Sequence, residues 1–189
     1  MDPLTRLFGS PARLKLLRLF VFNQGTALTL SEVATRSKLE QGAARRELAE
    51  LTLAGFVTKR GERAKAKYQT NARLESLPAL ARFIRETTIL RPEHIIGTLK
   101  RAGTLRVVAL SGLFTGVLET QIDLLVVGDN LDVRTLAKAV HNLEAELGRE
   151  IRYAAFETAD FRYRLGVYDR LLRDVFDYPH RLLVDRIGL

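Results

Sequence analysis

Two short, largely apolar runs set the strongest limit on the fold of this 189-residue chain. Residues 105–111 and 122–127 are too short for buried helices, and a glycine follows each. Runs of this length and composition are typical of buried strands. Residues 136–147 then carry apolar side chains at the spacing of one helix face, Gly148 is placed to cap that helix, and another strand-like run covers 151–156. The pattern predicts an α/β layer with a small mixed sheet in this half of the chain.

The positive charge of the chain is concentrated in its first half. The formal net charge is +8, with 30 Lys and Arg against 22 Asp and Glu. Residues 1–90 contain 16 basic and 8 acidic residues, whereas residues 91–189 contain 14 of each. A concentrated positive field favours a polyanionic partner, most often nucleic acid and next an anionic membrane surface. Composition alone leaves a merely solvated basic face as an equal alternative.

The residues that are missing exclude several function classes. The chain has no cysteine, so disulfides, thiolate nucleophiles and cysteine metal sites are excluded. His94, His141 and His180 lie far apart in the sequence without acids at ligand spacing, so we predict no metal site. No apolar stretch approaches the ~20 residues of a membrane helix, and no signal core opens the chain. We expect a cytoplasmic protein without a membrane partner and without a cofactor.

The first half follows the order helix, helix, helix, hairpin. Ser10 and Pro11 are typical of a helix start, and a helix is predicted to run to about residue 22. A brief second helix is predicted over 31–37 and a third over about 40–54. Strand-like runs at 56–60 and 65–70 then flank a short turn, which predicts a β-hairpin rich in cations.

Three segments of this half resemble winged helix-turn-helix transcriptional regulators of the ArsR/MarR type. They are GSPARLKLLRLFVFN, LSEVATRSKLEQGAARRELAELTLAGFV and TKRGERAKAKYQTN, and together they cover roughly residues 5–72. The resemblance implies that the third helix enters the major groove of double-stranded DNA and that the hairpin contacts phosphates or the minor groove. The residues it implies as DNA contacts are Ser37, Lys38, Gln41, Arg45 and Arg46 on the turn and helix, and Arg60, Arg63, Lys65 and Lys67 on the hairpin. The alternative is a winged helix used for protein contacts.

A helical pattern over residues 74–91 connects the two halves. In winged-helix regulators such helices often pair two chains, so we expect a homodimer, although the helix could simply pack on its own domain. The predicted domains are 1–73 for DNA binding, 74–91 as the connecting helix, and 92–189 as the second domain. Six aromatic residues recur near the C-terminus, and a packed core explains them better than base stacking because this half is not net basic. They are Phe156, Phe161, Tyr163, Tyr168, Phe176 and Tyr178.

The segment VVALSGLFTGVLETQIDLLVVGD resembles small nucleotidyltransferases of the DNA polymerase β type, a similarity that covers about residues 92–185. Active members hold two metal ions with clustered carboxylates. This chain departs from their pattern, because Leu113 follows the turn glycine, Asp123 stands without its paired acid, and Arg152 occupies the place of a further carboxylate. We therefore expect a nucleotidyltransferase-like domain that is not an enzyme and has no catalytic residue.

These expectations combine into one hypothesis with two rivals. The predicted fold class is α+β, a winged helix-turn-helix domain followed by a small α/β nucleotidyltransferase-like domain. The predicted function is a sequence-specific transcriptional regulator whose second domain senses an effector or holds an assembly. A candidate pocket for a nucleotide or another small-molecule effector is formed by Gly112, Thr115, Gly116 and Asp123. Asp123 could instead be a strand-edge acid bonded to backbone amides. The rivals are a nucleotidyltransferase with residual activity and an antitoxin-like partner of another protein.

Overall fold

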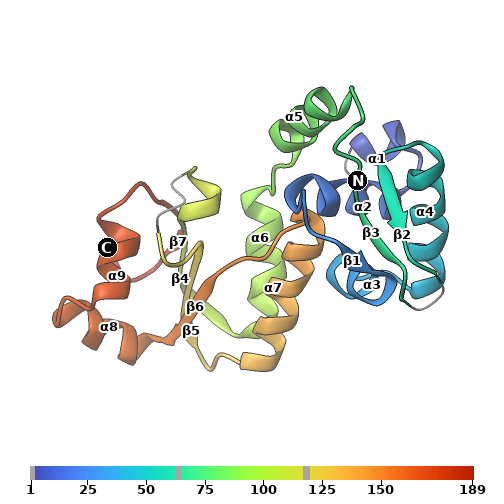
Figure 1. Ribbon diagram of the computed structural model, residues 1–189. Helices are drawn as coiled ribbons and strands as arrows, with labels where there is room; N and C mark the ends of the chain where they lie inside the picture. Colours follow the sequence, from blue (N-terminus) through green and yellow to red (C-terminus); the bar gives the residue numbers. More distant parts are fainter. Residues whose placement is uncertain (1–2, 63–64, 117–119) are drawn as a thin grey trace. The chain divides into compact units, whose positions relative to one another are not determined.

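The computed structural model describes residues 3–62, 65–116 and 120–189, and these form two compact units (Figure 1). The first unit comprises Met1–Ile89 with His141–Glu150, and the second comprises Leu90–Val140 with Ile151–Leu189. Residues 141–150, which the sequence pattern places in the second domain, therefore pack in the first unit. None of the helices in the described ranges is long and apolar enough to cross a membrane.

Among the described residues, the first unit contains five whole helices, the last part of α7 (Val133–Leu147) and a three-stranded antiparallel sheet. The helices are α1 (Pro3–Leu7), α2 (Pro11–Phe22), α3 (Leu30–Ser37), α4 (Gln41–Leu53) and α5 (Leu77–Thr87), and the strands are β1 (Leu28–Thr29), β2 (Val57–Arg60) and β3 (Lys67–Thr70). The sheet order is β1-β3-β2. The predicted three helices and hairpin are present, whereas α1 and the short strand β1 had no clear signal in the sequence.

Local signals in the sequence explain where α2 and α3 begin. The Ser10 hydroxyl accepts the backbone N–H of Arg13, and Pro11 opens α2. At α3 the Thr29 hydroxyl accepts the N–H of Glu32, while the Glu32 carboxylate accepts the N–H of Thr29, which completes a capping box. These caps satisfy N–H groups that a helix start would otherwise leave without partners.

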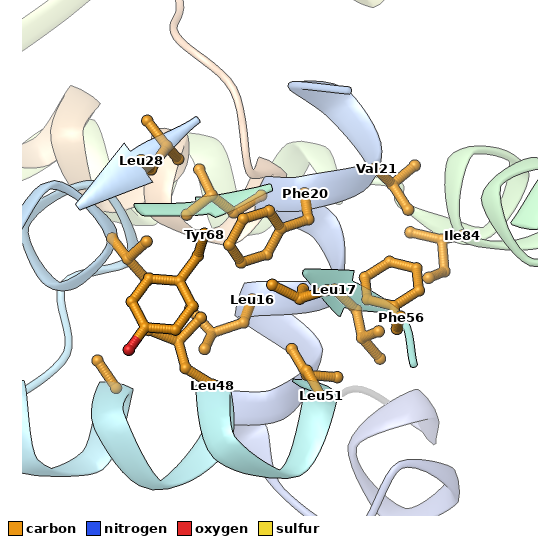
Figure 2. Packing of buried hydrophobic residues seen from close by; sticks show 14 of the residues in the cluster. Leu16, Leu17, Phe20, Val21, Leu28, Leu48, Leu51, Phe56, Tyr68 and Ile84 are labelled. Carbon is orange, nitrogen blue, oxygen red and sulfur yellow. The ribbon is translucent and has the colours of Figure 1, made fainter. Parts of the chain in front are cut away.

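The core of the first unit is built around α2, which is buried over most of its circumference. Leu16, Phe20 and Val21 are each 1% exposed or less although they point in different directions around the helix. Figure 2 shows Leu48 from α4 and Tyr68 from β3 packed around the α2 side chains. A helix that is apolar on most sides is stable only at the centre of its unit, and this position lets α3, α4 and the hairpin lie on the surface.

The second unit is a four-stranded mixed sheet with helices. Its strands are β4 (Thr104–Leu110), β5 (Leu124–Asp129), β6 (Tyr153–Glu157) and β7 (Arg181–Asp185), and its helices are α6 (Pro92–Leu99), α8 (Thr158–Gly166), α9 (Arg170–Phe176) and the first part of α7 (Val133–Leu147), with short 3-10 turns at Lys100–Ala102 and Gly112–Phe114. The sheet order is β6-β5-β4-β7; β5 and β6 are parallel, and β4 is antiparallel to both neighbours. The predicted mixed sheet and α+β class are confirmed.

The aromatic residues of the second unit divide into buried and exposed groups. Phe161 is fully buried, and the half-buried Phe156 and Phe176 pack against the same cluster. Tyr163 and Tyr168 are 70% and 80% exposed. The packed-core prediction is therefore correct for the phenylalanines and wrong for these two tyrosines, and also for Tyr178, which is 47% exposed. On α8 the reason is helical geometry, since two residues after the inward Phe161 the chain has turned about 200°.

Candidate nucleic-acid interface

Helix α4 has one buried face and one fully exposed face. Ala44, Leu48 and Leu51 are at most 4% exposed and pack on the core. At about 100° per residue, Arg46 lies on the side opposite these three, and Arg45 lies on the flank. Both arginines are exposed. The helix therefore presents two neighbouring cations in different directions, one straight outward and one to the side.

Arg13 of α2 pairs with carboxylates of α4. Arg13 Nε lies 2.8 Å from Glu47 Oε2, and Arg13 Nη2 lies 3.8 Å from Glu50 Oε2. The Glu47 side chain is only 14% exposed, so it contributes little field to the surface. This arrangement offsets one of the two negative charges on α4 and so reduces the repulsion that they would exert on a polyanion.

A groove of about 1200 Å³ runs between α4, the hairpin and the start of α3. Among the described residues that line it, none carries a carboxylate, and two are cations, Arg45 and Lys59. The full lining is Thr29, Leu30, Ser31, Gln41, Arg45, Ala49, Thr52, Leu53, Lys59, Ala66 and Tyr68. A concave surface with positive charge and no negative group favours an anionic occupant.

The register of the hairpin decides which of its cations faces this groove. Lys59 is directly opposite Tyr68, and Arg60 is opposite Lys67. Side chains alternate between the faces of a strand, so Lys59 shares its face with the buried Val57 and Tyr68, whereas Arg60 and Lys67 share the other face. Lys59 was missed among the predicted contacts; the alternation from Val57 was the signal that could have identified it.

Two predicted DNA contacts are engaged within the protein. Ser37 is 1% exposed and its hydroxyl donates to the carbonyl of Val33, which removes it from the exposed face of α4. Lys38 adopts a left-handed conformation at the end of α3, and its Nζ lies 2.5 Å from Asn142 Oδ1. Asn142, in the segment 141–150, therefore contacts the end of α3. The sequence offered no signal for this contact.

The remaining predicted contacts lie on α4 and on the hairpin, but they do not all face the groove. Gln41 and Arg45 line the groove, Arg46 points outward, and Arg60, Lys65 and Lys67 are exposed on the hairpin, while Arg63 lies outside the described residues. Within the ranges that the structure describes, none of these exposed arginines and lysines forms an ion pair, and neither does Lys59. Cations outside ion pairs remain available to a partner, although the charge of Lys67 also acts on the Glu32 carboxylate.

Gly42 offers a test in which stability and binding change in opposite directions. It lies exposed in the first turn of α4, and an added Cβ would meet only Arg46 Nη1, at 3.9 Å. Gly42→Ala is expected to stabilise the fold by about 0.5–1 kcal/mol, because alanine loses less backbone entropy in a helix. If α4 docks on DNA along this face, the new methyl group holds the helix away and weakens binding. Urea unfolding and DNA titration measure the two effects; unchanged DNA affinity in a stabilised variant would contradict docking through this face.

In the second unit, Asp123 is held by Arg152 and by backbone amides. The carboxyl group is 3% exposed. Arg152 Nε lies 3.0 Å from Oδ2 and Nη2 lies 2.8 Å from Oδ1. The N–H of Leu113 donates to Oδ1 at 2.8 Å and that of Arg152 to Oδ2 at 3.0 Å. Asp123 is thus the strand-edge acid bonded to backbone amides, with an ion pair added.

The rest of the candidate effector pocket is packed closely around this carboxylate. Gly112 has φ 49°, and a Cβ there would overlap Asp123 Oδ1 and Thr120 Oγ1. Thr115 lies on the same loop, and its hydroxyl is within 3.3 Å of the Gly112 carbonyl, while Gly116 is exposed. Gly112 and Asp123 therefore lie in contact, but the guanidinium of Arg152 already donates hydrogen bonds to both carboxylate oxygens of Asp123. Among the described residues, no cluster of three His, Asp or Glu side chains could hold a metal ion.

The Asp123–Arg152 pair predicts an acid-dependent loss of stability. Burial alone would raise the pKa of Asp123, but the hydrogen bonds from Arg152 and Leu113 outweigh it and hold the pKa below its ordinary value. The stabilisation is therefore complete above the unfolded pKa of ~3.9 and is lost as the pH falls through the lower folded pKa. Arg152→Ala removes the side-chain hydrogen bonds that lower this pKa while the burial that raises it remains, so we expect a loss of about 1–3 kcal/mol at neutral pH, discounted because Arg152 is 48% exposed. Acid destabilisation should also begin at a higher pH. The measurement is the urea midpoint of the wild type and of Arg152→Ala at each pH from 7 to 3.5. A difference between the two midpoints that stays constant over this range would refute the role of the ion pair.

Comparison with known proteins adds little to this geometry. No protein-family profile matches the sequence, and no curated protein does. Among solved structures, reduced HlyU from Vibrio cholerae N16961 is similar to 44% of this chain and to 82% of its own, with 23% sequence identity and a TM-score of 0.35. This level of similarity does not assign a function to the chain.

Proposed function

We propose that this chain is a sequence-specific DNA-binding transcriptional regulator that contacts duplex DNA through α4 and the β2–β3 hairpin. The observation that carries the proposal is the groove between α4 and the hairpin, whose described lining includes the cations Arg45 and Lys59 and no carboxylate. Ion pairing of Glu47 to Arg13 leaves this region net positive. Duplex DNA is the polyanion that such a helix and hairpin fit together.

The roles of the side chains follow from DNA chemistry. An arginine that reaches the major groove can donate two hydrogen bonds to guanine O6 and N7, and a glutamine can bond adenine in the same way. Gln41, Arg45 and Arg46 are the exposed α4 residues of these types. The hairpin cations would supply affinity without sequence preference, because phosphates are the same at every base pair.

The proposal is tested by fluorescence anisotropy with labelled duplexes. The purified full chain is titrated onto the DNA upstream of its own coding sequence and onto a scrambled duplex of the same composition, each at several salt concentrations. We expect affinity for the native duplex to exceed that for the scramble by about 10³, with a steep negative dependence on salt. Equal, weak binding to both would reduce the basic side to a nonspecific nucleic-acid surface.

We propose that the second unit is catalytically inactive and acts as an effector-sensing or assembly domain. Two-metal nucleotidyl transfer needs several carboxylates around two cations, and here the buried Asp123 is already paired with Arg152. The test is incubation with labelled nucleoside triphosphates and Mg²⁺ or Mn²⁺. A labelled product that disappears in Asp123→Ala would establish an enzyme and overturn this proposal.

We also propose that the regulator is a homodimer that pairs through α5. Leu77, Ala81 and Ile84 bury one face of this helix, while Phe83 is 39% exposed and Ile89, just after the helix, is 75% exposed. A symmetric dimer would bind two half-sites about one turn of DNA apart. Sedimentation equilibrium on the full chain distinguishes a dimer from a monomer, and Phe83→Ser/Ile89→Ser should shift the population toward monomer. A wild-type monomer at all concentrations would refute the proposal.

A further inference from the structure

We infer that Arg45 and Lys59 together bind one sugar-phosphate strand in the groove between α4 and the hairpin, and that Arg46 alone of these three cations reads bases. This inference rests on the proposed function and divides its contacts by role. The sequence predicted Arg45 and Arg46 as DNA contacts of the same kind, and it did not predict Lys59 as a contact.

Arg45 and Arg46 point to different sides of α4. Gln41, Arg45 and Thr52 lie on the side of α4 that lines the groove, together with Ala49. Arg46 follows Arg45 by one residue and is rotated about 100° from it, directly away from the buried Ala44 and Leu48. Consecutive arginines on a helix therefore reach different surfaces, and Arg46 does not line the groove.

The width of the DNA limits where its two phosphate strands can pass. An α-helix with its side chains is about 10–12 Å across, and the major groove of B-DNA is about 12 Å wide. If α4 enters that groove with Arg46 toward the base edges, the two phosphate strands at its borders must pass along the flanks of the helix. On the flank of α4 that carries Arg45, the protein surface forms the groove of about 1200 Å³ between α4 and the hairpin.

The opposite wall of that groove carries Lys59. Lys59 of β2 lies on the sheet face shared with Val57 and Tyr68, and it lines the groove across from α4. Arg60, its neighbour in sequence, points to the other sheet face with Lys67. Arg45 and Lys59 are the two cations of the described lining, which holds no carboxylate to oppose a phosphate. A lysine and an arginine on facing walls suit the uniform charge of a strand better than the varied edges of bases.

The experiment measures how each cation contributes to salt dependence and to sequence preference. Affinities of the full chain for its upstream duplex and for the scrambled duplex are determined from 50 to 300 mM NaCl. The proteins are the wild type, Arg45→Ala, Lys59→Ala and Arg46→Ala, with Arg60→Ala as the matched control. Arg60→Ala removes the same charge from the same strand but from the opposite face. All four substituted side chains are exposed, so the variants should fold, and urea midpoints verify this.

Each phosphate contact that is lost should reduce the magnitude of the slope of log K against log salt by about 0.9. We expect that reduction for Arg45→Ala and Lys59→Ala on both duplexes, with the ratio of native to scrambled affinity unchanged. Arg60→Ala should reduce the magnitude of the slope of log K against log salt by less than half of that amount. Arg46→Ala should instead lower that ratio at least fivefold.

Two results would overturn the inference while leaving the proposed function intact. One is a loss of sequence preference in Arg45→Ala, which would place Arg45 on a base. The other is an equal slope change for Lys59→Ala and Arg60→Ala, which would indicate a diffuse field rather than a strand in the groove. If the wild type binds neither duplex, the proposed function itself fails, so the two failures are distinguishable.

Discussion

Removing both adjacent arginines of α4 is expected to lower affinity for the native duplex by at least about 5-fold to 150-fold, the range that follows from roughly 1–3 kcal/mol for the base contact of Arg46. The lost phosphate contact of Arg45 adds to this loss. Arg45→Ala/Arg46→Ala removes a groove cation and an outward cation together. Both are exposed and neither forms an ion pair within the described ranges, so the free energy of unfolding should change by no more than ~0.5 kcal/mol. Anisotropy titration at fixed salt measures the loss of affinity.

A double variant of equal charge provides the control for this result. Arg73 is exposed in the loop after β3, and Arg82 is exposed on α5, where it pairs with Glu86. Arg73→Ala/Arg82→Ala lowers the net charge of the chain by the same amount away from α4 and the hairpin. We expect a small, salt-sensitive decrease in its affinity. If both double variants weaken binding equally, or if the α4 variant binds its best site unchanged, α4 is not the recognition helix.

The largest effect on stability is expected at Gly148. This residue has φ 78°, and an added Cβ would lie 2.5 Å from the backbone N of Leu19 and closer still to the carbonyl carbon of Arg18. Its own carbonyl accepts a hydrogen bond from the Asn23 amide at 2.8 Å. Gly148→Ala therefore combines left-handed strain with an overlap against helix backbone, which cannot move aside like a side chain. We expect a loss of about 2–5 kcal/mol, measured by urea unfolding.

Gly25→Ala separates the two causes of this loss. Gly25 also has a left-handed backbone, with φ 86°, but an added Cβ there meets no atom within 4 Å. We expect this variant to lose only about 1–2 kcal/mol, from backbone strain alone. If Gly148→Ala costs no more than Gly25→Ala, residues 141–150 do not pack on α2 as the structure describes.

Much of the first unit was predictable because local signals and tertiary packing agree. The third helix was predicted over about 40–54 and is observed at Gln41–Leu53, since Ala44, Leu48 and Leu51 mark one buried face. The hairpin was predicted at 56–60 and 65–70, where apolar and charged residues alternate around a glycine turn. The two-residue strand β1 was missed, because Leu28 and Thr29 become a strand only by pairing with β3.

The candidate interface was predicted by residue type but not by direction. The resemblance to winged-helix regulators, which rests on residue types along the chain, implied Gln41, Arg45 and Arg46. It did not reveal that Ser37 is buried, because burial there depends on packing among elements distant in sequence. It also did not separate Lys59 from Arg60, because that distinction depends on which sheet face meets the core.

By itself, the sequence determined the α+β class, the mixed sheet, the helices and hairpin of the first half, and the concentration of positive charge there. These properties follow from hydrophobic period, caps and composition, all of which are local. Only the tertiary structure decided that residues 141–150 pack in the first unit, that Arg152 pairs with Asp123, and that the groove has Arg45 on one wall and Lys59 on the other. Each of these contacts joins residues well separated in sequence, and no periodicity along a chain specifies which distant surfaces will meet.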